Sequence, residues 1–174
     1  MRNVIYLLVL VTLYSCCESK NVTFKKGDIT KEKEVIDKFL VDWHKSAAEA
    51  NYEAYFNAIT NDGVFIGTDA SENWTIPEFK NFSKPYFDKG KAWSFTAVKR
   101  NIYISSYGKI AWFDELLDTH MGVCRGSGVL SKNDSLWKIK HYVLSLTIPN
   151  DNIDKVKGIN KEKDAIFLRS LRKN

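Results

Sequence analysis

The fold is decided by three successive segments near the C-terminal end: Ile110-Ala-Trp-Phe-Asp-Glu-Leu-Leu117, Val123-Cys-Arg-Gly-Ser-Gly-Val-Leu130 and Leu136-Trp-Lys-Ile-Lys-His-Tyr-Val-Leu144. β-Branched and aromatic residues are frequent in all of them, which favours strands. The connections around Met121 and over residues 131–135 are short enough for antiparallel hairpins. A further strand is predicted before them, from Trp93 to Ile104, so this part of the chain should be a meander of long strands.

Each of the three segments carries an ionisable side chain among large apolar ones: an acid (Asp114 or Glu115), Arg125 and His141. Adjacent strands would bring these groups close together. A buried charge without a partner is costly, so we expect the groups to meet each other or a ligand. Neighbouring residues of a strand point to opposite faces, and alternation does not choose between the two acids. We favour Asp114 as the pocket-facing acid and take Asp114 and His141 as candidate catalytic residues.

Structural roles are open for the same residues. Asp114 and Arg125 could form a buried ion pair, and His141 could be a hydrogen-bonded core histidine. Two glycines surround Ser127 in Arg125-Gly-Ser-Gly128, which indicates a bulge, a close approach of other atoms or a bend of the sheet. In the functional interpretation, Arg125 and Ser127 grip an anionic group of a ligand, and Trp112 contacts it from the face that carries Asp114.

The part of the chain before Gly90 is predicted to be mainly helical. Asn51 suits the cap of a short second helix, and Thr75-Ile-Pro-Glu78 is a capping box that starts a third helix, which Pro85 should limit. Asp62-Gly63 indicates a turn before a short strand over residues 64–67. The first helix begins at Lys31, and its apolar stripe is formed by Val35, Phe39, Leu40, Trp43, Ala47 and Ala50.

Helices followed by a strand meander predict an α+β domain in which a curved antiparallel sheet wraps over the N-terminal helices as a cone. An open, apolar cone with a few polar groups is the usual form of a small-molecule site. Trp43 and Tyr55 are candidate ligand contacts from the helices, and Asp69, Glu72 and Trp74 are candidates from the loop before the capped helix. Alternatively, the aromatic residues are core, and Asp69 only makes an Asx turn.

The pattern of the first residues predicts an export signal. Arg2 precedes an apolar run over residues 4–13 that is too short to span a bilayer, and Leu13-Tyr-Ser-Cys16 resembles the end of a bacterial lipoprotein signal, in which the cysteine is acylated. We expect a signal peptide over residues 1–15, a tether over 16–30, the domain over 31–149, and a polar link with a C-terminal helix over 150–174. Cys16 would then anchor an exported, periplasmic or surface-facing protein to the membrane, and an ordinary secretory signal is the alternative.

The composition of the chain limits the number of domains and the kinds of partner and cofactor that we expect. A chain of 174 residues, 44% of them hydrophobic, suits one globular domain. The net charge of +5 is dispersed, without an arginine-rich tract interleaved with aromatics, so we expect no nucleic-acid partner. The three histidines lack metal-ligand spacing, so we expect no metal, and no cofactor is indicated. Lipidation of Cys16 leaves no disulfide framework, and Cys124 is interpreted as a small buried residue.

Four pieces of the sequence carry a resemblance to a known family: Phe65-Ile-Gly-Thr-Asp-Ala-Ser-Glu-Asn-Trp74, Ala111-Trp-Phe-Asp-Glu-Leu-Leu117, Arg125-Gly-Ser-Gly-Val-Leu130 and Trp137-Lys-Ile-Lys-His-Tyr-Val-Leu-Ser145. From roughly Glu34 to Pro149 the chain resembles the SnoaL-like branch of the nuclear-transport-factor-2-like superfamily, in a bacterial lipoprotein subgroup. The resemblance implies the cone fold. It implies no single activity, because the superfamily includes isomerases, cyclases, dehydratases and non-catalytic binders.

Three functions follow as hypotheses. The first is a membrane-anchored domain that binds a small, partly apolar molecule, with an anionic group as one option. The second is an enzyme that moves a proton next to a carbonyl, with Asp114 or His141 as the base. The resemblance implies this option, because in enzymes of the nuclear-transport-factor-2-like superfamily a pocket Asp or His shuttles a proton. The third is a non-catalytic module that forms a homodimer through the outer face of its sheet.

Overall fold

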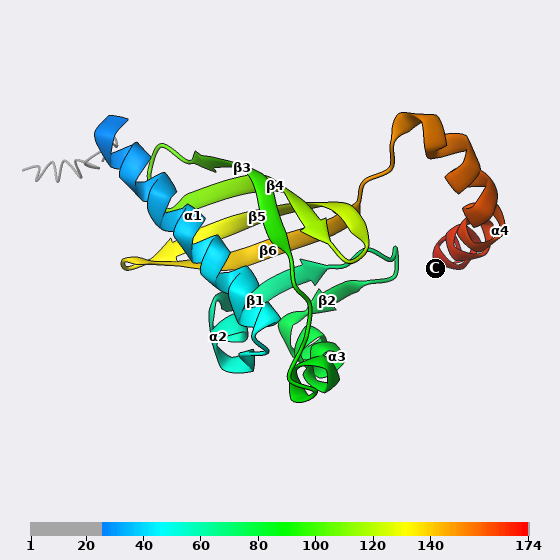
Figure 1. Ribbon diagram of the computed structural model, residues 1–174, viewed down its shortest axis with the longest axis horizontal. Helices are drawn as coiled ribbons and strands as arrows, with labels where there is room; N and C mark the ends of the chain where they lie inside the picture. The colour runs from blue at the N-terminus through cyan, green and yellow to red at the C-terminus, as the bar shows by residue number, and fades with distance from the viewer. Residues whose placement is uncertain (1–25, 174) are drawn as a thin grey trace, which may run out of the picture.

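The computed structural model describes residues 26–173 of the chain, so the predicted signal peptide and Cys16 lie outside the described residues. Helices and strands follow one another in a mixed order (Figure 1). They are α1 (Lys26–Ala48), α2 (Tyr52–Asn57), β1 (Ile59–Ile66), β2 (Asn73–Thr75), α3 (Ile76–Asp88), β3 (Thr96–Ile104), β4 (Ile110–Thr119), β5 (Gly122–Asn133), β6 (Leu136–Leu146), the 3-10 turn η1 (Asn150–Asn152) and α4 (Ile153–Leu171).

The strands form one six-stranded sheet in the order β2-β1-β6-β5-β4-β3. The four long C-terminal strands pair antiparallel with their neighbours in sequence, which confirms the predicted meander. β1 comes much earlier in the chain and pairs parallel with β6, while β2 pairs antiparallel with β1. The short early strands therefore extend the sheet at the far side of β6.

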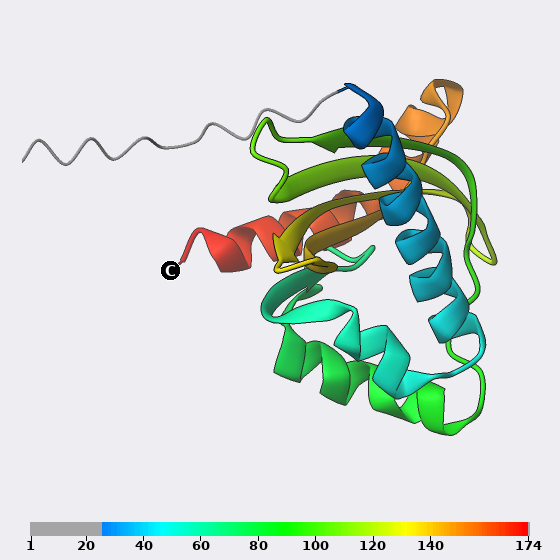
Figure 2. The same cartoon turned by 90° about the vertical axis from the view of Figure 1, so that its left-hand side faces the viewer.

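Helices cover the concave side of the sheet, which confirms the predicted α+β cone. Figure 2 shows α1 running across this side, with α2 and α3 at one end of the molecule. The buried face of α1 is apolar apart from one histidine, and it packs where the sheet curves over it. Its buried residues are Ile36, Leu40, Trp43, His44 and Ala47.

Two predicted helix starts are confirmed by their caps. The Asn51 side chain accepts a hydrogen bond of 3.1 Å from the backbone N–H of Ala54 at the start of α2. At the start of α3, the backbone N–H and the hydroxyl of Thr75 donate to Glu78 Oε2 at 2.8 and 2.7 Å. A capping box satisfies amide groups that the first helical turn leaves without partners.

Several helix limits differ from the predictions. α1 begins at Lys26, five residues before the predicted start, and Asp28 in its first turn favours the helix dipole. Val35 is 54% exposed, and its neighbour Ile36 takes the expected core position. α3 continues through Pro85 to Asp88. Both Pro85 and Asn81 are exposed, so water can reach the Asn81 carbonyl, which lacks its usual helical donor.

The last helix is longer than predicted and stands apart from the rest. α4 begins at Ile153 and has no buried residue. It projects beyond the end of the sheet and extends to the side opposite α1 (Figures 1 and 2). Among residues 26–173, no helix combines the length and the apolar character needed to cross a membrane.

Candidate functional site

Of the two neighbouring acids on β4, Glu115 is the one that lies inside the cone. Along β4, the side chains of Ala111, Phe113, Glu115 and Leu117 are buried, so these alternate positions form the inner face. Asp114 lies on the opposite face, where its Oδ1 accepts a 3.0 Å hydrogen bond from Asn101. The prediction that Asp114 faces the pocket is therefore wrong, because the strand's alternation places the other acid inside.

Side chains of His44, Tyr142 and Arg100 surround the Glu115 carboxylate, whose side chain is fully buried. His44 Nε2 lies 2.8 Å from Oε1, and the Tyr142 hydroxyl donates to the same oxygen at 3.1 Å. On the other oxygen, Arg100 Nε donates at 2.8 Å and Arg100 Nη2 lies at 2.7 Å. The cluster thus joins α1, β3, β4 and β6 around one negative charge.

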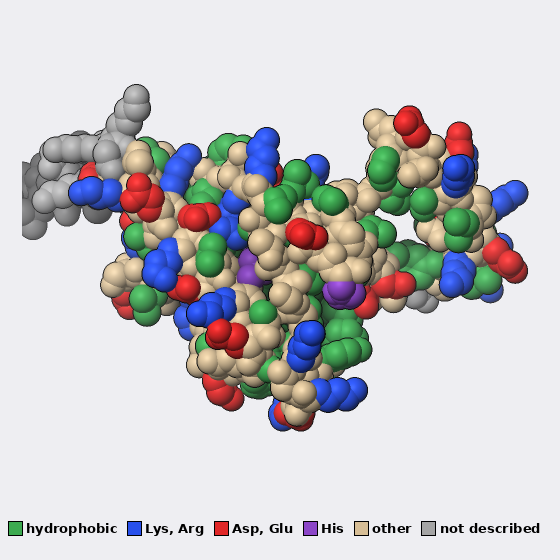
Figure 3. All heavy atoms as spheres, in the orientation of Figure 1, with side chains coloured by type: hydrophobic (Ala, Val, Ile, Leu, Met, Phe, Trp, Pro, Cys, Tyr) green, Lys and Arg blue, Asp and Glu red, His purple; other side chains and the backbone are tan. Residues whose placement is uncertain are grey.

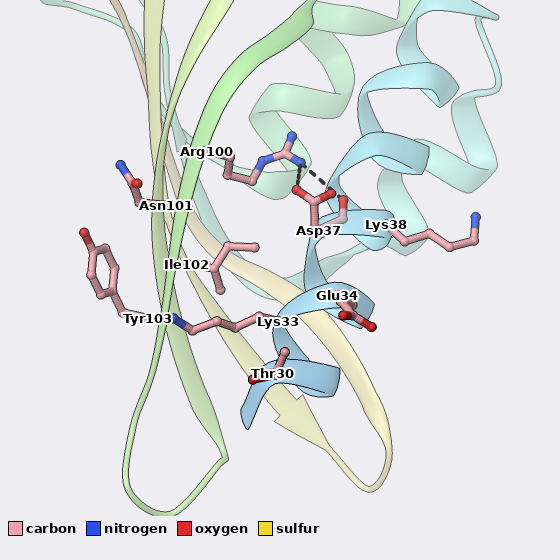
Figure 4. Close-up of a pocket in the computed structure, with 9 residues that line it drawn as sticks. All are labelled: Thr30, Lys33, Glu34, Asp37, Lys38, Arg100, Asn101, Ile102 and Tyr103. Atoms are coloured by element: carbon pink, nitrogen blue, oxygen red, sulfur yellow. Dashed lines mark hydrogen bonds and ion pairs between the residues drawn. The ribbon is translucent and has the colours of Figure 1, made fainter. Parts of the chain in front are cut away.

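Arg100 also ties the sheet back to α1. Its Nη1 donates to Asp37 Oδ1 at 2.7 Å and to the Asp37 carbonyl oxygen at 3.2 Å. Figure 4 shows Arg100 and Ile102 pointing from β3 towards α1, while Asn101 and Tyr103 point away. The side chain of Arg100 is only 5% exposed although it borders an open groove between α1 and β3.

The surroundings keep Glu115 ionised. Burial raises the pKa of its carboxyl, but the hydrogen bond from His44 and the charge of Arg100 outweigh burial, and the net pKa lies below the ordinary value. For Tyr142, burial and the neighbouring Glu115 charge raise the pKa of the phenol well above its ordinary value. Tyr142 therefore stays a neutral hydroxyl that donates to a carboxylate.

The glycines of Arg125-Gly-Ser-Gly128 make room for this cluster and for the ring of Phe113. A Cβ at Gly126 would lie 2.3 Å from the Tyr142 hydroxyl and 2.7 Å from Glu115 Oε1. A Cβ at Gly128 would lie 2.7 Å from the Phe113 ring. The close approach that the two glycines predicted is confirmed: side chains of the neighbouring strands approach both glycines, and the His141 carbonyl oxygen also approaches Gly128.

An apolar cavity of about 310 Å³ lies at the end of the cone near α3. It opens between α3, the loop from β1 to β2, the hairpin from β4 to β5 and the segment before β3. Figure 3 shows hydrophobic side chains gathered over α3 beside a histidine. The cavity is lined by Phe65, Gly67, Thr68, Glu72, Trp74, Phe79, Phe82, Tyr86, Trp93, Phe95, His120, Met121 and Leu144.

Aromatic rings form most of the cavity wall and pack on one another. Trp74 stacks on Phe82 with 4.4 Å between ring centroids and on Phe79 with 5.5 Å. Phe79 stacks in turn on Phe65 at 3.9 Å. Such mutual packing holds each ring in place, so this wall is largely formed before any ligand arrives.

Among the described residues, Glu72 is the one carboxylate that lines the cavity. Its side chain is half-buried and folds over Gly67, where an added Cβ would lie 2.2 Å from Glu72 Oε2. The same oxygen accepts a 3.1 Å hydrogen bond from the Asp69 backbone N–H. Asp69 accepts hydrogen bonds from the backbone and hydroxyl of Ser71, which lower the pKa of its carboxyl, as does the nearby charge of Lys163 on α4.

Phe95 stands between the cavity and the ionic cluster. It lines the aromatic cavity and also a smaller hollow of about 230 Å³ that His44 and Arg100 border. Its ring meets the His44 ring edge-on, with 6.1 Å between centroids. The apolar cavity and the buried charges are thus neighbours separated by one aromatic side chain.

The predicted trio does not come together inside the cone. Asp114, Arg125 and His141 all lie on the outer face, in three different rows of the sheet, because they pair with Ser127, Leu116 and Val129 respectively. Among the described residues, no ion pair links any two of them. The expected interior pocket built from these three residues is therefore wrong, since all three positions share the face opposite Glu115.

The other candidate residues divide between three places. Trp74 and Glu72 line the cavity, with Asp69 beside them on the same loop. Trp43 and Tyr55 are buried in the core, where their rings stack with centroids 5.0 Å apart. Two residues lie on the outer face: Ser127, which pairs with Asp114, and Trp112, which is 47% exposed and stacks on Tyr103.

Sequence reasoning missed the partners of Glu115. His44 is not part of the apolar stripe predicted for the first helix, but it is only 5% exposed. Its position four residues after Leu40 and three before Ala47 places it within the buried stripe, and that spacing was the available signal. Arg100 sits in a polar run of β3 with no local sign of burial, so only the packing of α1 over the sheet reveals it.

Comparisons with known proteins agree with this architecture. The family model of the SnoaL-like domain matches residues 36–149, more than half of the chain. A domain of unknown function with a cystatin-like fold from Nostoc punctiforme has a TM-score of 0.60 at 13% identity, covering 83% of this chain and 99% of that one.

Two further solved structures show the same fold. A nuclear-transport-factor-2-like protein of unknown function from Pseudomonas putida has a TM-score of 0.59 at 11% identity, covering 71% of this chain and 92% of that one. The association domain of calcium/calmodulin-dependent kinase II from Caenorhabditis elegans has a TM-score of 0.56 at 18% identity, covering 67% and 97%. No curated protein shows significant sequence similarity. On the family match and the shared architecture, this chain belongs to the SnoaL-like domain family.

Proposed function

We propose that this SnoaL-like domain binds a small, largely apolar molecule with a ring in the aromatic cavity beside α3, and that an acylated Cys16 holds the domain at a bacterial membrane. The observation that carries the binding proposal is the cavity itself. Its volume of about 310 Å³ suits a small organic molecule, and aromatic side chains dominate its wall. The contacts come from Trp74 and its neighbours, and the outer-face residue Arg125 takes no part.

The ionic cluster supports binding ahead of proton transfer. A general base needs a free lone pair facing the substrate and a pKa near the working pH. Both oxygens of Glu115 already accept hydrogen bonds, from His44 and Tyr142 on one side and from Arg100 on the other. These bonds also hold the pKa of the carboxyl below its ordinary value, which weakens it as a base.

The tether proposal rests on the sequence before the described residues. An apolar run that follows Arg2 ends directly before Cys16, and about nine residues separate that cysteine from the start of α1 at Lys26. Several acyl chains on one cysteine anchor a protein stably. The cavity would then face the compartment beyond the membrane.

A thermal-shift screen of ring-bearing small molecules tests the binding proposal. The soluble chain, beginning at Glu18, is measured beside two variants that lose the same side chain, Trp74→Ala in the cavity and Trp112→Ala on the outer face. We expect compounds that stabilise the wild type and the Trp112→Ala variant but shift Trp74→Ala by less than about a third as much, because only Trp74 lines the cavity.

Circular dichroism checks that both variants are folded before the comparison. Should Trp74→Ala fail to fold, Leu144→Phe provides a second test, because it fills the cavity from β6 and should also abolish the shift. A library without any stabilising compound, or shifts that are equal in the two tryptophan variants, would overturn the proposal.

A further inference from the structure

We propose that the ligand of the aromatic cavity is an organic cation, such as an alkylated ammonium that carries a ring. This inference rests on the proposed binding function and adds the charge of the ligand. Among the described residues, the lining of the cavity offers aromatic rings, the carboxylate of Glu72 and the imidazole of His120, and it has no lysine or arginine. That combination of side chains favours a positively charged ligand.

The charged side chains of the cavity wall favour a cation. Of the lining residues within 26–173, Glu72 is the one carboxylate, and none is a lysine or an arginine. The whole chain has 26 Lys and Arg against 21 Asp and Glu, so a lining in which the described residues include no lysine or arginine departs from the composition of the chain. An anionic ligand would lose its hydration here without gaining the permanent counter-charge of a lysine or an arginine.

The aromatic rings of the cavity wall also favour a cation. Aromatic faces carry negative electrostatic potential, and cations bind over them with an attraction that grows as water is removed. Trp74 stacks on Phe82, and the Tyr86 ring lies next to Phe82 in a tilted arrangement with 5.6 Å between ring centroids. Phe82 is 40% exposed and Tyr86 is 45% exposed, so this end of the stack remains accessible at the mouth of the cavity.

The position of Glu72 allows its carboxylate to pair with a bound cation. Its carboxylate lies half-buried against the cavity wall, where it accepts a hydrogen bond from the Asp69 amide. It fits there because Gly67 has no side chain. Within residues 26–173, no lysine, arginine or histidine forms an ion pair with it. A partly desolvated carboxylate without a cation gains from a positively charged guest. The charge of Lys163 on α4 acts on Asp69, on the same loop.

A matched series of probes tests the inference directly. Benzyltrimethylammonium, its neutral isostere neopentylbenzene and the anion phenylacetate share one ring and differ in charge. Binding to the soluble chain is measured by tryptophan fluorescence and by calorimetry at low and high salt. We expect the cation to bind at least about tenfold more tightly than the neutral isostere, and the anion to bind most weakly.

Two glutamate variants locate the effect. Glu72→Gln keeps an acceptor for the Asp69 amide and removes the charge, while Glu53→Gln makes the same change at an exposed site on α2. We expect Glu72→Gln to weaken the cation about tenfold and to leave the neutral isostere within about twofold, with Glu53→Gln unchanged for both.

The outcomes separate the two proposals. Equal or tighter binding of the neutral or anionic probe, in a cavity that Trp74→Ala still disables, would overturn the cation inference and leave the binding function standing. An unchanged cation affinity in Glu72→Gln would also overturn the inference. Absence of binding by all three probes, together with a failed ring-compound screen, would overturn both.

Discussion

Glu115 is the residue on which the interior of the cone depends. A carboxylate buried without partners would be expelled or neutralised, whereas here His44, Arg100 and Tyr142 supply hydrogen bonds to both oxygens. Removing one member of such a cluster leaves the others buried and unsatisfied. The cluster also explains Gly126, since any side chain at that position would meet Glu115 and Tyr142.

The pH dependence of stability should reveal this carboxylate. Because its folded pKa lies below the unfolded value, Glu115 contributes stability above the ordinary glutamate pKa of about 4.3, and this contribution is lost as the pH falls through the folded pKa. We expect Glu115→Gln to lower the free energy of unfolding by about 3–5 kcal/mol at pH 7, and the difference from wild type to shrink below pH 4.3.

Urea denaturation at pH 7, 5, 4 and 3 measures this difference. Glu53→Gln is the matched control, because it removes an exposed carboxylate from α2 and should change the free energy of unfolding by less than about 0.5 kcal/mol. A Glu115→Gln effect that stays constant down to pH 3, or one as small as that of the control, would contradict the role assigned to the cluster.

At the scale of elements, the helices differ sharply in how they are held. α1 buries Ile36, Leu40 and Ala47 against the sheet and adds the Asp37 bridge to Arg100. A second tie joins Glu32 on α1 to Lys132 and to the Trp137 indole at the other end of the sheet. α4 has no buried residue, and its apolar side chains, such as Ile159, remain largely exposed.

Removal of α4 should therefore leave the domain intact. We expect a chain truncated after Pro149 to keep its melting temperature within about 2 °C of the parent, because few contacts are lost and the sheet and α1 are unchanged. Differential scanning calorimetry of the two soluble chains measures this. Ile36→Ala, which removes a fully buried side chain from α1, is the destabilising control and should cost about 2–5 kcal/mol. A fall of more than 5 °C on truncation would show that α4 supports the core.

At the scale of the whole molecule, one end of the cone carries the aromatic cavity, and the proposed membrane anchor precedes the start of α1 in the chain. α1 begins at Lys26 and crosses the sheet towards α2 and α3, so its start lies away from the cavity beside α3 (Figures 1 and 2). A tether at that start would leave the cavity open to its surroundings. The homodimer through the outer sheet face stays a prediction.

The anchor is tested by two adjacent cysteines. In a bacterial host, we expect the full chain to appear in the membrane fraction with an acylated N-terminal peptide beginning at Cys16, as detected by mass spectrometry. Cys16→Ser should abolish both, and Cys17→Ser should leave both unchanged. An unmodified Cys16, or a mature N-terminus elsewhere, would contradict the lipoprotein interpretation.

Local patterns predicted a large part of this architecture. The alternation and hairpin signals from Ile110 to Leu144 predicted adjacent antiparallel strands, and Asn51 and Thr75 predicted two helix starts, because these features depend on neighbours within a few residues. The loop candidates Trp74 and Glu72 were also found from sequence, and they line the cavity. Pro85 misled the prediction, since a proline on an exposed helix face costs less than one inside the core.

The sequence by itself determined the strand meander, the capped helices and, through its motifs, the family. Only the tertiary structure decided which face of β4 lies inside, and so that Glu115 rather than Asp114 is buried. The physical reason is that a strand presents two alternating faces of similar composition here, and the choice between them depends on where α1 and Arg100 pack. Residues as distant in sequence as His44, Arg100 and Tyr142 meet only when the sheet closes over that helix.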